Sequence, residues 1–425
     1  MHRPWLVALS LALALAPNAL RPSSARANPE APAFDARAVG MGGTGLAFLD
    51  SPAALFHNPA NLAGLEGFEA TVSAAAIAVD LEAPVRGDGS TSHTGLSLAP
   101  LVLVGVAMPL RRHVVLGFGA YLNTGYGGRF AQVTRIAGYD LDTPQDQSAL
   151  LFIGELSAPL ALRVSPQLDL GLTLRLPYGR QAADVTQEVF PDAWVPVHQS
   201  VSGFGLPGIL IGATYRPIPS LALALTYRSK VVIQMEGQTA LTLSDGAAPL
   251  QSPTRTSWAV PHALGFGVAH HALDNRLLTT AELRVQFHHE ANRAQILHVA
   301  DQRIVVPLQW KNVYSARVGA EWMAGNVPLR VGYNLSTSAS EARAMQNFTP
   351  PPGLLHALYA GFGVSVADFA LDFALDFALH FSFGQADVVT APDRCQAGER
   401  VKVGCGGHYA VRAGWLAFSM RYAAP

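Results

Sequence analysis

The most constraining feature of the sequence is a fifteen-residue stretch, 369–383, in which a large apolar residue occupies every second position. The odd positions are all Phe or Leu, whereas the even positions carry Ala, Asp, His or Ser. Successive side chains point to opposite faces of a β-strand, whereas a helix with this sequence would spread Phe and Leu around most of its circumference. Strands in globular proteins average about 5–6 residues, so a soluble sandwich rarely sustains such a pattern. The stretch predicts a long strand with one apolar face and one small or polar face.

The same alternation recurs along the rest of the chain. In 168–176, for example, leucines alternate with Asp169, Gly171, Thr173 and Arg175, so that the charges share one face. A watery lumen with a lipid exterior requires this arrangement. We count about fourteen such segments, with approximate spans 68–81, 94–108, 113–123, 151–164, 168–180, 203–216, 220–236, 257–272, 275–289, 310–323, 327–338, 354–367, 369–384 and 408–422.

The connections between these segments alternate between short and long. Short connections such as 109–112 and 324–326 are followed by long ones such as 124–150, 181–202, 237–256 and 290–309. Outer-membrane barrels have short periplasmic turns and longer extracellular loops. The sequence therefore predicts an all-β fold, a transmembrane antiparallel β-barrel of about fourteen strands that occupies residues 68–425.

Composition agrees with a barrel and excludes several other classes. Half of the residues are hydrophobic, only 14% are charged and the mean hydropathy is +0.23, whereas soluble domains carry about 25% charged residues. No window offers the roughly 20 consecutive apolar residues of a transmembrane helix. The formal net charge is −1 and no basic block occurs, so we expect contact with outer-membrane lipid and none with nucleic acid.

The N-terminus has the pattern of a secretory signal peptide. His2 and Arg3 form a short positive end, 6–16 is an apolar core, and Ala25-Arg26-Ala27 offers a cleavage site. We therefore predict a signal peptide over 1–27 and a mature chain that starts at Asn28. An N-terminal membrane anchor is the alternative, although the apolar run is short for a membrane span.

Residues 28–67 differ from the rest of the chain, because they are rich in Gly, Ala and Pro. The run from Gly40 through Met41, Gly42 and Gly43 to Gly45 superficially fits a dinucleotide-binding loop, but no βαβ unit surrounds it. We interpret it as backbone that passes close to other backbone and expect no cofactor. Further on, Asn58-Pro59-Ala60 reads as a turn, because a residue before proline avoids the α conformation.

Other potential chemistry in the sequence is sparse. Cys395 and Cys405 lie in the last long connection, where an oxidising exterior favours a disulfide. A metal pair is the alternative, but His408 is the one further ligand type beside it. The histidine pairs 270–271 and 288–289 lack any spacing typical of a metal site. No G-x-S-x-G elbow is present, so the sequence does not predict an enzyme.

The stretch 36–63 resembles the start of the FadL-type outer-membrane transport family, which opens with a Met-Gly-Gly segment and an Asn-Pro-Ala motif. Two further parts, 329–356 with its Arg-x-Gly-Tyr and Pro-rich loop and 208–237 with its Tyr-x-Pro turn, are also similar to that family. The resemblance implies a fourteen-stranded barrel whose N-terminal segment, here 28–67, plugs the lumen as a hatch. It assigns the following residues to the hatch: Gly40, Met41, Gly42, Gly43, Asn58, Pro59 and Ala60. The chain departs from such barrels at its end, because Tyr422 is followed by Ala-Ala-Pro rather than being terminal.

The resemblance also implies a function. Members take up long-chain fatty acids or, in some cases, aromatic hydrocarbons, so we expect a passive, hatch-gated outer-membrane channel for hydrophobic small molecules, with long-chain fatty acids favoured. Within the hatch, Leu55, Phe56 and Leu62 are expected to offer a ligand an apolar surface. Two alternatives remain: a general diffusion porin, which needs an open charged lumen and no plug, and an outer-membrane lipid hydrolase, which needs a catalytic triad.

Overall fold

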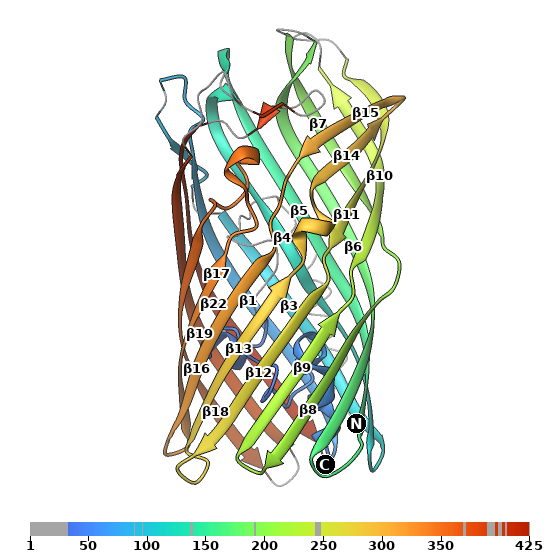
Figure 1. Ribbon diagram of the computed structural model, residues 1–425, viewed down its shortest axis with the longest axis vertical. Coiled ribbons are helices and arrows are strands. Elements are labelled where there is room, and N and C mark those ends of the chain that lie inside the picture. Colours follow the sequence, from blue (N-terminus) through green and yellow to red (C-terminus); the bar gives the residue numbers. More distant parts are fainter. Residues whose placement is uncertain are drawn as a thin grey trace.

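The computed structural model is a closed antiparallel barrel (Figure 1). It describes residues 33–88, 90–95, 97–136, 139–190, 193–242, 248–368, 371–388, 396–397, 402–403 and 406–424. Fourteen strands form the wall: β1 (Phe68–Ala83), β3 (Ser97–Arg111), β4 (Val114–Ile136), β5 (Tyr139–Arg163), β6 (Leu168–Phe190), β8 (Gly208–Ile218), β9 (Leu221–Arg228), β12 (Ala263–Ala272), β13 (Leu277–Gln286), β16 (Val313–Ala324), β17 (Val327–Thr337), β18 (Leu354–Asp368), β19 (Leu371–Val388) and β22 (Gly407–Ala424). Each strand pairs with the next in this order, and β22 pairs with β1 from Phe68↔Ala424 to Glu82↔Ala410. The predicted fourteen-stranded barrel is confirmed.

The wall strands show the alternation that the sequence predicts. In β19, Leu379, Phe381 and Phe383 are 60%, 52% and 45% exposed, whereas Ala378 and Ser382 are buried. Leu170, Leu172 and Leu174 of β6 likewise face outward, and Thr173 is fully buried between them. The apolar residues therefore form the lipid-facing band, and the small or polar residues face the lumen.

Beyond this band the sheet continues into the extracellular space, where the sequence had predicted loops. β4, β5 and β6 run on without interruption, and further strands join them: β7 (Ala193–Phe204), β10 (Val231–Leu241), β11 (Leu250–Val260), β14 (Ala294–Val299) and β15 (Gln302–Pro307). The predicted loops 124–150, 181–202, 237–256 and 290–309 are therefore largely strands. Water borders the exterior here, as the exposed ion pair between Arg255 and Glu236 shows, so these strands lack an outward apolar row.

Short elements complete the described chain. They are β2 (Ser92–His93), β20 (Gln396–Ala397), β21 (Lys402–Val403), α4 (His288–Ala291) and η2 (Ala342–Ala344). Breaks at 205–207, 229–230 and 261–262 divide the spans 203–216, 220–236 and 257–272, each of which the sequence pattern presents as one strand. None of the helices in the described chain is long and apolar enough to cross a membrane.

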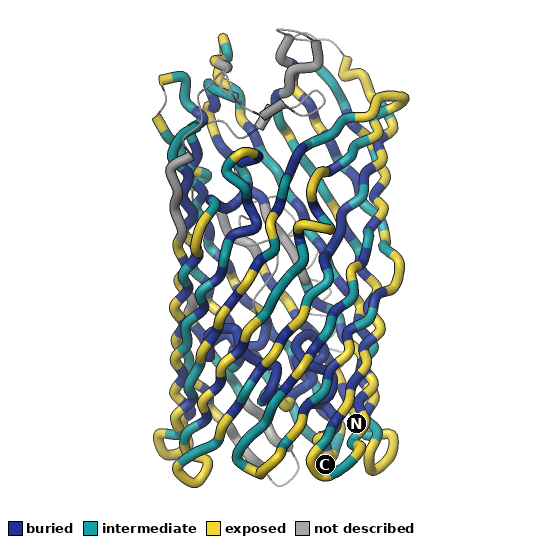
Figure 2. The backbone as a smooth tube through the Cα atoms, viewed as in Figure 1, coloured by how far each residue is buried: buried dark blue, intermediate teal, exposed yellow. Residues whose placement is uncertain are grey.

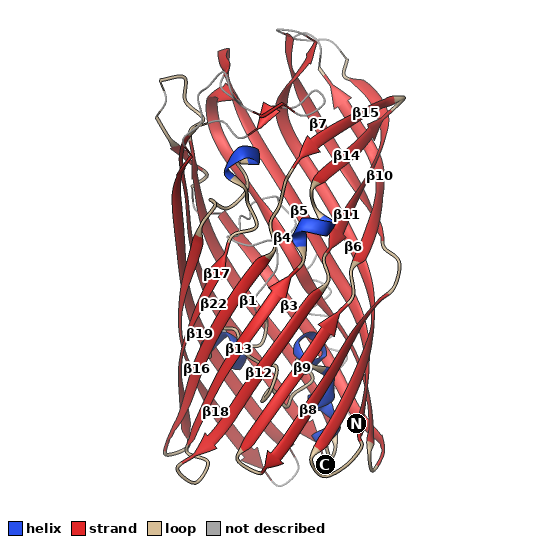
Figure 3. Ribbon diagram, in the orientation of Figure 1, coloured by secondary structure: helices blue, strands red, loops and turns tan. Residues whose placement is uncertain are grey.

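The segment 33–67 lies inside the periplasmic half of the barrel (Figure 3). It forms α2 (Ala36–Gly40), α3 (Ala54–His57) and η1 (Pro59–Gly64). The side chain of Asp35 caps α2 by accepting hydrogen bonds from the amides of Arg37 and Ala38. Almost every residue of this segment is buried (Figure 2). Gly40 is the last residue of α2 and residues 41–43 follow it, so the run does not join a strand to a helix as a dinucleotide-binding loop does.

Replacing Leu358 with Arg should destabilise the barrel by about 2–4 kcal/mol, because Leu358 lies in the outward apolar row of β18 and an arginine there must enter the hydrocarbon region. Leu250 provides a matched control: it is 55% exposed, as Leu358 is, but it lies on the extracellular strand β11. Denaturant unfolding in lipid vesicles measures both changes. Equal losses at the two positions would contradict the assignment of the membrane band.

Candidate functional site

Glycines of the wall allow the N-terminal segment to approach the barrel backbone. An added Cβ at Gly319 would lie 2.4 Å from the carbonyl oxygen of Met41, and one at Gly332 would lie 2.1 Å from the amide nitrogen of Gly42. Gly42 and Gly43 adopt φ values of 80° and 77°, which L-residues with a Cβ rarely adopt. Glycine is therefore required on both sides of this contact.

The Asn58-Pro59-Ala60 motif makes a second close contact with the wall. The Asn58 side chain accepts a hydrogen bond from the amide of Ala60 at 3.1 Å and donates to Leu46 O at 2.8 Å and to Thr214 Oγ1 at 2.9 Å. Pro59 begins the 3-10 helix that follows. On the wall side, an added Cβ at Gly212 would lie 1.9 Å from Asn58 Oδ1. The motif therefore fixes its own turn and ties the segment to β8.

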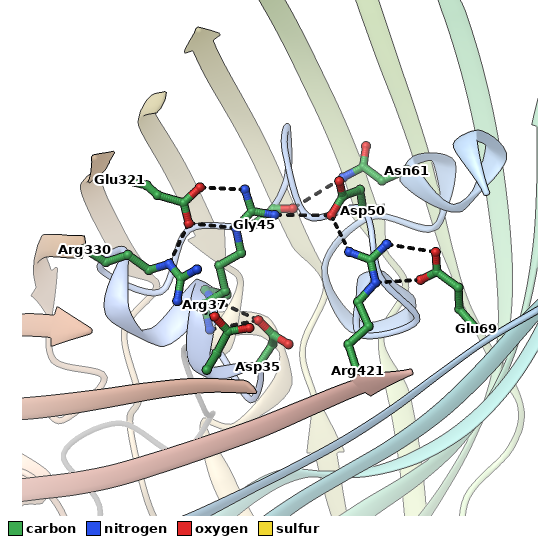
Figure 4. A network of polar contacts seen from close by, with 11 residues as sticks. Asp35, Arg37, Gly45, Asp50, Asn61, Glu69, Glu321, Arg330 and Arg421 are labelled. Carbon is green, nitrogen blue, oxygen red and sulfur yellow. Dashed lines mark hydrogen bonds and ion pairs between the residues drawn. The ribbon is translucent and has the colours of Figure 1, made fainter. Parts of the chain in front are cut away.

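An ion-pair network joins the periplasmic side of the segment to the wall (Figure 4). Arg37 contacts Glu321 of β16 at 2.8 Å and Asp50 at 3.2 Å. Asp50 also contacts Arg421 of β22 at 3.4 Å, and Arg421 pairs with Glu69 of β1 at 2.8 Å. Because Asp50 is 62% exposed, this part of the network faces water and is screened by salt.

On the opposite, extracellular side, two arginines of the wall hold the segment. Arg317 of β16 donates to Gly43 O at 2.7 Å, and Arg284 of β13 lies 3.1 Å from His57 Nδ1. Glu282 pairs with Arg284 at 2.7 Å and accepts hydrogen bonds from two amides of the segment, those of Gly45 and Leu46, at 2.5 and 2.6 Å. These contacts fasten the top of the segment to the barrel.

A cavity of about 1070 Å³, including its open mouth, lies directly above these contacts. Its floor is formed by Leu46, Phe56 and His57 of the segment, and its wall comes from β8, β9, β12, β13, β16, β17, β18, β19 and β22. Its wall combines apolar side chains such as Leu210, Leu355 and Trp415 with polar ones. Of the three residues predicted to offer a ligand an apolar surface, Phe56 lines this cavity, whereas Leu55 packs against Gly105 and Gly119 and Leu62 belongs to a separate cluster with Val115.

The cavity carries an excess of positive charge. Arg228, Arg284 and Arg317 line it, and no Asp or Glu occurs among its described lining residues. The neighbouring buried layer adds Arg175, which pairs with Glu155 at 2.6 Å. Glu155 and Glu282 are the carboxylates that pair with Arg175 and Arg284. Guanidinium groups form charge-assisted hydrogen bonds with carboxylates, so the cavity suits an anionic ligand group.

Apolar side chains connect the cavity region to the extracellular half of the lumen. Phe34, Phe56 and Tyr121 contact one another with ring centroids 4.8–5.6 Å apart. The same cluster of buried residues continues upward to Phe130 and Met345. A hydrophobic chain would find an apolar surface along this side of the lumen.

Other candidate sites from the sequence find little support in the described chain. Cys395 and Cys405 lie outside the described residues, so their pairing remains a prediction. No cluster of three or more His, Cys, Asp or Glu side chains suited to a metal occurs among the residues that the structure describes. On the extracellular sheet, Ser148 and His198 both contact Asp184, so His198 is not placed as a base for Ser148, as a hydrolase triad would require.

The closed barrel with its apolar exterior and occupied lumen defines an outer-membrane transport channel. The family described as outer membrane protein transport protein (OMPP1/FadL/TodX) matches residues 23–423. The chain belongs to this family, and it is a transport protein of the outer membrane rather than an enzyme.

Solved structures of the same fold agree with this assignment. A FadL homologue of Pseudomonas aeruginosa superposes with a TM-score of 0.80 at 15% identity, over 93% of this chain and 99% of that one. The toluene transporters TbuX of Ralstonia pickettii and TodX of P. putida give TM-scores of 0.71 and 0.73 at 17% and 16% identity, again over 93% of this chain and 99% of theirs. No curated protein matches the sequence.

The arginines of the cavity are functional candidates that sequence reasoning missed. Arg284 and Arg317 lie in strands whose residues alternate between apolar and polar, and both occupy positions that face the lumen. This alternation marks them as interior charges. Nothing in the sequence indicates that they lie beside Arg228 of β9 or beside the N-terminal segment. The sequence indicates which face of its strand each arginine occupies, but it does not indicate where that strand lies around the barrel.

Proposed function

We propose that this channel takes up hydrophobic molecules with an anionic head group, long-chain fatty acids above all, and that residues 33–67 act as its hatch. The observation that carries the proposal is the cavity above the segment, where three arginines meet an apolar floor. A carboxylate accepts charge-assisted hydrogen bonds from guanidinium groups, and an alkyl chain suits the apolar cluster that rises from Phe56 to Phe130. A neutral aromatic hydrocarbon would form no charge-assisted hydrogen bond with these arginines.

A general diffusion porin is the main competing function. Such a porin needs an open aqueous lumen, whereas residues 33–63 are packed against the wall and almost entirely buried. A hatch also agrees with the position of the cavity, because Arg284 and Arg317 both line the cavity and hold the segment. A ligand carboxylate that binds Arg284 and Arg317 competes with their bonds to His57 and Gly43. Ligand binding would therefore shift the hatch toward a second arrangement.

Replacing Arg228 with Gln should weaken hexadecanoate binding about tenfold or more, because a hydrogen bond to a charged group contributes about 1.5–3 kcal/mol. Arg228 is the preferred position because the contacts that fasten the hatch are made by Arg284 and Arg317 instead. Displacement of a fluorescent fatty acid from the purified protein measures the affinity, and toluene serves as an uncharged comparison ligand whose affinity should not fall.

Arg255, an exposed arginine of the extracellular sheet, provides the control, and Arg255→Gln should bind hexadecanoate normally. The proposal of an anionic head group is wrong if Arg228→Gln and Arg317→Gln both bind hexadecanoate as tightly as the original protein. Tight toluene binding without any hexadecanoate binding would instead assign the channel to aromatic hydrocarbons.

A further inference from the structure

The outward apolar row of β6 ends at an aromatic pair. Beyond Leu174, the ring centroids of Tyr178 and of Phe204 on β7 lie 5.0 Å apart, and Phe204 is 62% exposed. Aromatic residues form girdles where the hydrocarbon of a membrane meets its head groups. This pair therefore marks the extracellular edge of the lipid-facing band on this side of the barrel.

A row of charged side chains crosses the outer face of the sheet just beyond this edge. Arg180 lies on the same face of β6 as Tyr178, roughly 6–7 Å further along the strand. From Arg180 the strand register continues through directly opposite residues on β7, β10, β11, β14 and β15: Ser202, Glu236, Arg255, His298 and Arg303. All of these side chains are exposed except that of Ser202, which is half-buried. Opposite residues share one face of a sheet, so these six positions form one surface, here called the outer row.

The outer row is basic. It holds three arginines and a histidine against one carboxylate, that of Glu236. Glu236 lies 3.1 Å from Nε of Arg255, with 69% and 77% of the two side chains exposed, and so exposed an ion pair contributes little to stability. On β6, β7, β10 and β11 the next positions of the same face are uncharged: Ala182, Ser200, Gln238 and Pro253. The arginines are therefore available to an anion from outside the chain.

The position of the outer row indicates the kind of anion. A guanidinium binds a phosphate group through two parallel N–H donors, and clusters of basic residues beside a membrane recognise anionic lipid head groups. Arg180 lies at the edge of the lipid band, whereas Arg303 lies on β15, near the extracellular end of the barrel (Figure 1). Neighbouring strands are about 4.8 Å apart, so Arg255 and Arg303, two strands apart, are separated by about 10 Å.

A lipid with anionic groups at several heights fits this spread of arginines. A phospholipid presents its phosphate at one depth, beside the hydrocarbon. A phosphorylated glycolipid presents further anionic groups along its sugars, outside the hydrocarbon. The outer row, which begins at the lipid edge and continues toward the extracellular end, matches the glycolipid.

We propose that the outer row binds the phosphate groups of a phosphorylated glycolipid of the outer leaflet, lipopolysaccharide, whose acyl chains lie against the leucines of β6. Such binding holds the barrel at a fixed depth in the leaflet. The inference concerns the outside of the wall and does not depend on which ligand the lumen takes up.

The test measures the binding of fluorescently labelled lipopolysaccharide to the full-length protein in detergent micelles. Replacing Arg180, Arg255 and Arg303 together with Gln should weaken binding about a hundredfold, because each basic residue beside an anionic lipid surface strengthens binding about fivefold. The effect should shrink at high salt, which screens exposed charges. The change in electrophoretic mobility on heating shows whether the barrel is folded.

The matched control makes the same charge change at the periplasmic end of the barrel. Arg111, Arg112 and Arg276 are exposed there, beside the short turns, and their joint replacement with Gln should leave the binding of lipopolysaccharide unchanged. Equal affinity of the two triple variants would overturn the inference.

The variant Glu236→Gln tests the outer row in the opposite direction. It removes the carboxylate of the row and should therefore tighten the binding of lipopolysaccharide about fivefold. A misfolded barrel cannot produce such a gain, so this variant decides if the triple variant does not fold. Unchanged or weaker binding would contradict the electrostatic basis of the proposal.

Competition against the labelled lipopolysaccharide identifies the occupant. Lipopolysaccharide stripped of phosphate, phosphatidylglycerol and inorganic phosphate should each compete at least about tenfold less well than intact lipopolysaccharide, because each lacks part of the set of charged groups that the arginines bind. Equal competition by phosphatidylglycerol would assign the row to anionic lipids in general, and equal competition by inorganic phosphate would assign it to the free ion. Equal competition by the stripped form would show that phosphate is not recognised. Each of these three results overturns the proposal.

Discussion

Deleting residues 40–63 is expected to leave a folded barrel that conducts ions several-fold better and binds hexadecanoate at least tenfold more weakly. The barrel should survive because its first strand begins at Phe68 and β1 pairs with β22 without help from the segment. Conductance should rise because the deleted residues occupy the periplasmic half of the lumen (Figure 3). Affinity should fall because Leu46 and Phe56 form the floor of the cavity, and burying such a side chain contributes about 1.5–3 kcal/mol.

Single-channel recordings in planar bilayers measure the conductance, and displacement of a fluorescent fatty acid measures the affinity. A deletion of Ala300 and Asp301, at the tip of the hairpin between β14 and β15, controls for the removal of residues and should change neither quantity. The change in electrophoretic mobility on heating shows whether each barrel is folded. If the deletion of 40–63 gives a folded barrel with unchanged conductance, the segment is not a plug and the hatch mechanism is wrong.

The wall of the barrel was predictable because lipid on one side and the lumen on the other require apolar residues at every second position of each strand. Leu379, Phe381 and Phe383 face hydrocarbon, and every second residue between them faces the lumen. The extracellular sheet is not bound by this requirement, because its outer face meets water, as the exposed pair of Arg255 and Glu236 shows. Its apolar residues, such as Val201, Ile233 and Met235, point inward instead. Without an outward apolar row, the strand from Ala193 to Phe204 lies almost wholly within a segment that the sequence presents as a long connection.

The candidate site was predictable only in part, for a different reason. The local motifs 40–43 and 58–60 are visible in the sequence because they are short and depend on backbone conformation. The cavity depends on which strands close the lumen around the segment, and Arg228, Arg284 and Arg317 come together only when their strands take their places in the barrel. His57 and Arg284, which lie 3.1 Å apart, are separated by 227 positions in the chain, and no local pattern relates them.

Replacing Gly332 with Ala should unseat the hatch while the barrel remains folded. The new Cβ would lie 2.1 Å from the amide nitrogen of Gly42 and 2.4 Å from the carbonyl carbon of Met41. These are backbone atoms and cannot move aside as a side-chain tip can. Overpacking of this kind costs typically about 1–3 kcal/mol, and moving the short contact away from the wall relieves it more easily than distorting β17, which pairs along its length with β16 and β18.

We therefore expect Gly332→Ala to raise conductance and to weaken hexadecanoate binding, in the same direction as the deletion but less strongly. Gly319 faces Gly332 across the strand pair and also meets Met41, so the double substitution should exceed either single one. Gly154→Ala is the matched control, because the nearest atom to its added Cβ is 3.6 Å away, an ordinary van der Waals distance. If the Gly332→Ala and Gly154→Ala proteins showed the same conductance and the same affinity for hexadecanoate, the added methyl group would be harmless at both positions. That result would contradict the prediction that Gly332 is needed for the hatch to pack against the wall.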